Sequence, residues 1–82
     1  MPAPSTQEIV DSFTREVTNH LDQTKLDGPV RLDNTHTVVI IPLKDRGPIH
    51  AHVQGGINEN GVQNILKQIA TVPSLKGLLR NS

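Results

Sequence analysis

The sequence contains no cysteine, no tryptophan and no tyrosine, and it has one phenylalanine, Phe13. The lack of cysteine excludes disulfides and thiolate metal ligands as sources of stability. The lack of large aromatic residues means that Val, Ile and Leu must build the core. A chain of 82 residues buries only about 60–65% of the surface that its unfolded form exposes. Small domains of this kind usually need a supplement, and a partner subunit is the one we expect here.

The sequence also has no excess of charge, because eight basic and eight acidic residues give a formal net charge of zero. This balance argues against nucleic acid or a membrane surface as the main partner. The charges are unevenly placed, however. Residues 1–35 hold six acidic and three basic residues, whereas residues 36–82 hold five basic and two acidic ones. Such a dipole would help to orient a subunit or a partner, over about 8 Å at physiological salt.

Long hydrophobic runs are absent too. The longest apolar stretch, from Val38 to Leu43, is too short to span a bilayer. The first ten residues lack the basic start and the apolar run of a secretory signal, so we expect an intracellular, cytoplasmic protein. No repeat, linker or low-complexity tract divides the chain. We therefore predict one domain over residues 1–82, with residues 1–4 disordered.

A first helix is predicted to begin at Thr6 and to run to about Thr24 or Lys25. Ser5 and Glu8 have the spacing of a capping box. Apolar residues then recur at steps of three and four and form one stripe: Ile9, Val10, Phe13, Val17 and Leu21.

Two or three antiparallel strands are predicted to follow. Residues 29–32 alternate in polarity and would form a short edge strand, and Asp33 and Asn34 after them tolerate the positive φ of a tight turn. Residues 36–43 are rich in β-branched side chains and apolar on both faces, which is typical of a strand covered on both sides. Residues 44–47 suit a type I turn with Gly47 in the left-handed position.

The returning strand, residues 48–54, alternates cleanly. Ile49, Ala51 and Val53 would point one way, and His50, His52 and Gln54 the other. One face of this strand is therefore polar, unlike either face of the strand before it.

A second helix is predicted after Gly55-Gly56, with Asn58 as its N-cap and Pro73 beyond its end. Ser74 would cap a last short turn that carries Leu75, Leu78 and Leu79. The fold class that results is a small two-layer α+β domain. It consists of an N-terminal helix, an antiparallel β-hairpin or three-stranded meander, and one long and one short C-terminal helix.

The histidines raise the question of a metal site. His50 and His52 would share one strand face, about 6.6–7 Å apart along the backbone, a spacing that can support shared metal coordination. His36 would lie at the same end of the hairpin as His52 and is the candidate third ligand. The interpretation that we prefer is a solvated or interface sheet face, with no metal and no cofactor.

Gly55 and Gly56 suggest a second kind of site, because free amides and the dipole at a helix N-terminus attract anions. Glu59 in the first turn would repel an anion, however, and no phosphate-binding motif follows the glycines. The alternative is that the glycines only turn the chain from strand to helix. No nucleophile and base are recognisable together, so we do not expect an enzyme. We do not expect nucleic acid as a partner either, because no aromatics accompany Lys44 and Arg46.

The apolar character of residues 36–43 is the main lead to function. If both helices pack on one face of the sheet, Val38 and Ile40 remain partly exposed on the other. We therefore predict a small protein-interaction or regulatory module that forms a homodimer, or binds another protein, through a face made of Val38, Ile40, His50, His52 and Gln54. The alternative is a domain that senses a small ligand or an anion, using either the His50 and His52 face or Gly55-Gly56.

Overall fold

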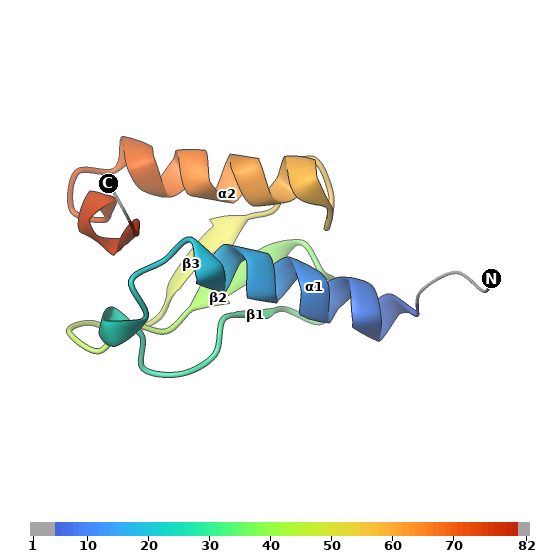
Figure 1. The fold of residues 1–82 in the computed structure, drawn as a ribbon, viewed down its shortest axis with the longest axis horizontal. Helices are drawn as coiled ribbons and strands as arrows, with labels where there is room; N and C mark the ends of the chain where they lie inside the picture. Colours follow the sequence, from blue (N-terminus) through green and yellow to red (C-terminus); the bar gives the residue numbers. More distant parts are fainter. Residues whose placement is uncertain (1–4, 81–82) are drawn as a thin grey trace.

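The computed structural model describes residues 5–80, and the prediction made for residues 1–4 lies outside this range. The elements along the chain are α1 (Thr6–Asn19), η1 (Gln23–Lys25), β1 (Arg31–Leu32), β2 (Val38–Ile41), β3 (Ile49–His52), α2 (Glu59–Thr71) and η2 (Lys76–Leu78). The strands form one antiparallel sheet in the order β1-β2-β3 (Figure 1). The predicted small α+β fold is confirmed in its three-stranded form. Its last element is a short 3-10 turn.

The start of α1 agrees with the prediction, but its end does not. Ser5 caps the helix by accepting a hydrogen bond from the Glu8 amide at 3.2 Å. The helix ends at Asn19, whereas the periodicity predicts an end at about Thr24 or Lys25. The Asp22 carboxylate accepts hydrogen bonds from the amide and the hydroxyl of Thr24, at 3.1 and 2.6 Å, and these bonds cap the separate turn η1. Local bonds of this kind compete with helix continuation.

Contacts with the C-terminal segment explain how Leu21 is buried beyond the end of the helix. Leu21 forms an isolated antiparallel bridge with Leu79, and the Asp22 amide donates to the Leu78 carbonyl at 2.7 Å. Leu21 therefore stays fully buried without a further helical turn. The Ser74 cap predicted for the last turn is absent, since η2 begins after Leu75 and has no side-chain cap.

Asp33 organises the turn between β1 and β2. One oxygen of its carboxylate accepts from the amides of Thr37 and Val38 at 2.9 and 3.1 Å, and the other accepts from the Thr35 hydroxyl at 2.6 Å. These bonds, the one from Thr35 first, lower the pKa of the Asp33 carboxyl from 3.8 to about 2. The positive φ expected at Asp33 or Asn34 occurs at His36 instead, at 59°.

The connection between β2 and β3 is a wide loop, so the prediction of a type I turn at residues 44–47 is wrong. Gly47 does not have a positive φ. Instead, Leu43 forms an isolated bridge with Leu26, and the Lys44 amide donates to the Lys25 carbonyl at 3.1 Å. Burial of Leu43, which is only 5% exposed, draws the chain away from β3 and towards η1.

Both helices pack on the same face of the sheet, which we call the inner face. Val39 and Ile41 of β2 point to this face and are fully buried. They belong to one core cluster, whose other fully or nearly fully buried helical members are Phe13 and Val17 of α1 and Val62, Ile65 and Ile69 of α2. Within residues 5–80, no helix has both the length and the apolar content needed to cross a membrane.

The start of α2 packs closely against Phe13 of α1 and against the backbone of Gly56. Asn58 caps this helix as predicted, and its side chain accepts from the amides of Asn60 and Gly61. A Cβ at Gly61 would overlap the Gly56 carbonyl oxygen and would lie 3.0 Å from a ring carbon of Phe13. Only glycine allows this approach, which sets α2 against α1 and over the sheet.

Candidate functional site

The second face of the sheet, here called the outer face, is defined by the strand register. Val38 pairs with His52, Ile40 pairs with His50, and Arg31 pairs with Ile40. Paired residues of antiparallel strands point to the same face, so the outer face consists of Arg31, Val38, Ile40, His50 and His52. The structure thus brings four of the five predicted interaction residues together.

The outer face has an apolar centre and a polar rim. Val38 and Ile40 on the central strand are half-buried, whereas Arg31, His50 and His52 on the two outer strands are exposed. Val38 and Ile40 are not among the side chains that form the hydrophobic core or pack against it. Gln54, the fifth predicted residue, is also exposed but lies two residues beyond the end of β3.

One side chain from α2 secures the edge of the sheet beside this face. The Gln68 amide nitrogen donates to the His52 carbonyl at 2.8 Å and to the Asn64 side chain at 2.7 Å. These bonds occupy a backbone acceptor on the edge strand β3 and fix that strand to the helix. His50 and His52 are therefore held on an anchored strand, and their side chains remain free of the core.

The third histidine lies elsewhere. His36 lines a hollow between α1 and β1, together with Val10, Asp11 and Asp33. Within residues 5–80, the structure shows no group of three or more histidine, aspartate or glutamate side chains placed to hold a metal ion.

At the candidate anion site, Gly55 and Gly56 both have a positive φ, of 91° and 87°. They turn the chain from β3 into α2. The amides of Asn60 and Gly61, which would serve an anion, already donate to Asn58. Glu59 adds a carboxylate in the same turn. This geometry favours the structural role of the two glycines over anion binding.

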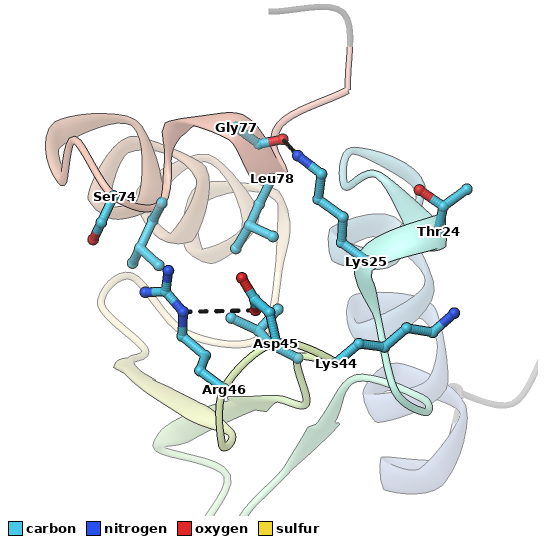
Figure 2. Close-up of a pocket in the computed structure, with 10 residues that line it drawn as sticks. Thr24, Lys25, Lys44, Asp45, Arg46, Ser74, Gly77 and Leu78 are labelled. Atoms are coloured by element: carbon cyan, nitrogen blue, oxygen red, sulfur yellow. Dashed lines mark hydrogen bonds and ion pairs between the residues drawn. The ribbon is translucent and has the colours of Figure 1, made fainter.

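A second concave region, which the sequence did not reveal, lies where η1, the loop of residues 42–48 and the C-terminal turn meet (Figure 2). We call this cavity of about 250 Å³ the basic pocket. It is lined by Thr24, Lys25, Leu43, Lys44, Asp45, Arg46, Ser74, Leu75, Gly77 and Leu78.

The basic pocket has a cationic rim. Lys25, Lys44 and Arg46 with a single carboxylate, Asp45, leave a net charge of +2, although the Lys44 ammonium points away from the other three groups in Figure 2. The Lys25 ammonium reaches across the opening and donates to the Gly77 carbonyl at 3.0 Å. Arg46 approaches from the opposite side, with its Nε 3.7 Å from an oxygen of Asp45. Three cationic side chains therefore line this one cavity.

The basic pocket escaped prediction because three departures from the expected elements create it. Lys25 reaches the rim because α1 ends early. Lys44 and Arg46 reach it because the loop between β2 and β3 is wide. Gly77 reaches it because the C-terminal segment returns to the end of α1. The Asp22 and Thr24 pair, a common local cap, is the signal that would have ended the helix before Lys25.

Comparison with known proteins adds no relatives, since no family model, no curated protein and no solved structure matches this chain. The outer face and the basic pocket are therefore the two surfaces from which we infer function.

Proposed function

We propose that this protein acts by binding, as a reversible homodimer that associates through the outer face. The observation that supports the proposal is the position of Val38 and Ile40. These two aliphatic side chains lie at the centre of the sheet, yet they neither belong to the core nor pack against it. A second copy would remove them from water.

The composition of the outer face suits pairing with itself. An apolar centre surrounded by polar side chains is the usual anatomy of a protein interface. A two-fold axis along β2 would place Val38 and Ile40 against the same residues of the second copy. The same axis would put the β1 edge of one copy over the β3 edge of the other, so the two Arg31 side chains would lie on opposite sides of the interface. Like charges therefore do not meet.

The size of the outer face sets the expected strength. Strands of two, four and four residues cover on the order of 150 Å², whereas a stable interface buries about 800 Å² per partner. Flanking loops must contribute, and the dimer should be weak. We expect a dissociation constant in the micromolar range or above, in line with small transient interfaces.

Sedimentation equilibrium over a range of protein concentrations tests this proposal. The wild type should show a reversible monomer–dimer equilibrium. Val38→Lys should weaken the association at least tenfold, because it places a charge in the apolar centre of the interface. Ala70→Lys is the matched control, since it adds the same charge at an exposed position of α2 and should leave the equilibrium unchanged.

Two results would overturn the proposal. One is a wild type that remains strictly monomeric up to about 1 mM. The other is a dimer that Val38→Lys does not weaken more than Ala70→Lys, which would place the interface on another surface.

A further inference from the structure

The basic pocket lies away from the outer face and shares no residue with it. Its rim is cationic, and its floor consists of Leu43, Leu75 and Leu78. We propose that the basic pocket binds a small amphipathic anion, namely a monocarboxylate or a phosphate monoester with a short aliphatic body. This inference concerns a second binding activity and does not depend on the homodimer.

Lys25 supplies the first point of attachment for the anion. Its ammonium is held across the opening by the bond to the Gly77 carbonyl at 3.0 Å. An ammonium has three donors, so two remain for a ligand. Because the ammonium is already positioned, little side-chain freedom is lost when an anion binds.

Arg46 supplies the second point of attachment. Its Nε lies 3.7 Å from Asp45, beyond hydrogen-bonding distance, and the two side chains are 43% and 76% exposed. Exposed pairs of this kind contribute little to stability. A ligand carboxylate or phosphate can therefore take the place of Asp45 and bind the planar guanidinium through two of its donors.

The apolar floor and the volume of the pocket limit the polarity and the size of the rest of the ligand. Leu43 and Leu78 are 5% and 6% exposed, and Leu75 is half-buried, so the floor is a firm apolar surface. The cavity of about 250 Å³ is smaller than the roughly 300–1,000 Å³ of pockets that hold drug-sized molecules. An aliphatic body of about six carbons fits these limits.

Titration of ¹⁵N-labelled protein with hexanoate and with hexyl phosphate, followed by NMR, tests the proposal. We expect saturable shifts at the amides of Lys44, Leu75 and Leu78, with a dissociation constant on the order of 1 mM or lower for at least one of the two probes. The stronger probe identifies the preferred head group. Hexan-1-ol lacks the charge and inorganic phosphate lacks the aliphatic body, so each should bind at least about tenfold more weakly.

Two variants with opposite expected effects sharpen the test. Arg46→Gln should weaken binding roughly three- to tenfold, because a charge-assisted bond is lost. Asp45→Asn should strengthen binding, because the competing carboxylate is removed. Arg15→Gln and Glu16→Gln make the matching charge changes at exposed positions of α1 outside the pocket and should have no effect.

The proposal fails if hexan-1-ol binds as well as the anions, or if the shifts of both anions rise linearly without saturation. It also fails if Arg46→Gln and Asp45→Asn do not move the dissociation constant in opposite directions. Neither result bears on the homodimer, which sedimentation measures separately.

Discussion

The two faces of β2 have nearly the same chemistry and very different surroundings. Val39 and Ile41 on the inner face are fully buried, whereas Val38 and Ile40 on the outer face are half-buried and lie outside the core. The helices account for the inner pair, because they need that surface to bury their own apolar stripes. The outer pair covers no helix in this way, since neither side chain belongs to the core cluster or packs against it. The outer pair is therefore the one for which binding offers an explanation.

Truncation of one isoleucine on each face should separate the two roles most clearly. Ile41→Ala should lower the free energy of unfolding by about 3–4 kcal/mol, because it leaves a cavity between the helices and the sheet. Ile40→Ala should lower it by about 1 kcal/mol, because the side chain loses only partial burial. Urea denaturation followed by far-UV circular dichroism, at a protein concentration low enough to keep the chain monomeric, measures both. Equal losses of unfolding free energy would contradict the difference between the two faces.

The next largest effect should come from the contact that holds α2 over the inner face. Gly61→Ala should cost about 2 kcal/mol, although alanine favours a helix by about 1 kcal/mol over glycine. The added methyl group would overlap the Gly56 carbonyl and press on Phe13. Gly47→Ala is the control, since a Cβ there meets nothing within 4 Å and Gly47 has no positive φ. Its urea midpoint should equal or exceed that of the wild type, and an unchanged midpoint in Gly61→Ala would show that α2 can move away from α1.

The residues that share each face could largely be predicted from the sequence, because the alternation of side chains along a strand depends on strand geometry alone. The Val38, Ile40, His50 and His52 cluster follows from the side-chain alternation of β2 and β3 once they pair antiparallel. That pairing had been expected through a tight turn at residues 44–47. The structure has a wide loop in place of this turn, yet the strand register still places these four residues on one face. Binding at this face stays a prediction.

The basic pocket was not readable, because it depends on contacts between segments far apart in the chain. Periodicity alone extended α1 through Leu21, which has the right spacing for the helical stripe. Leu21 is indeed fully buried, but a bridge to Leu79 buries it in an extended segment. A local pattern reports that a residue will be buried, and only tertiary structure decides which element carries it.

A smaller effect should follow from acid, because Asp33 maintains the turn that leads into β2. The pKa of its carboxyl is about 2 in the folded chain, below the ordinary 3.8. The unfolded chain therefore takes up a proton first as the pH falls. The stability that the carboxylate contributes is present above about pH 4 and is lost between about pH 4 and pH 2. Urea midpoints at pH 5 and pH 2.5 measure this loss.

Asp33→Asn should reduce the difference between those two midpoints, since an amide does not titrate. Asp27→Asn is the control, because its exposed carboxylate makes no side-chain hydrogen bond that the structure records within residues 5–80. If Asp33→Asn and wild type lose stability equally over this range, the turn does not depend on the charged form of Asp33.

The smallest effect on folding, and the most direct comparison of folding with binding, should come from Val38→Thr. Threonine keeps the β-branched shape and suits a strand, and in the monomer its hydroxyl can remain in contact with water. The free energy of unfolding at low concentration should change by less than about 0.5 kcal/mol. In the dimer the same hydroxyl would lose its contact with water in the apolar centre of the interface, which costs about 1–3 kcal/mol where no hydrogen bond replaces it. Sedimentation equilibrium should therefore show at least fivefold weaker association at unchanged stability. A parallel loss of both quantities would mean that Val38 serves the fold of the single chain, and a change in neither would mean that it serves neither folding nor association.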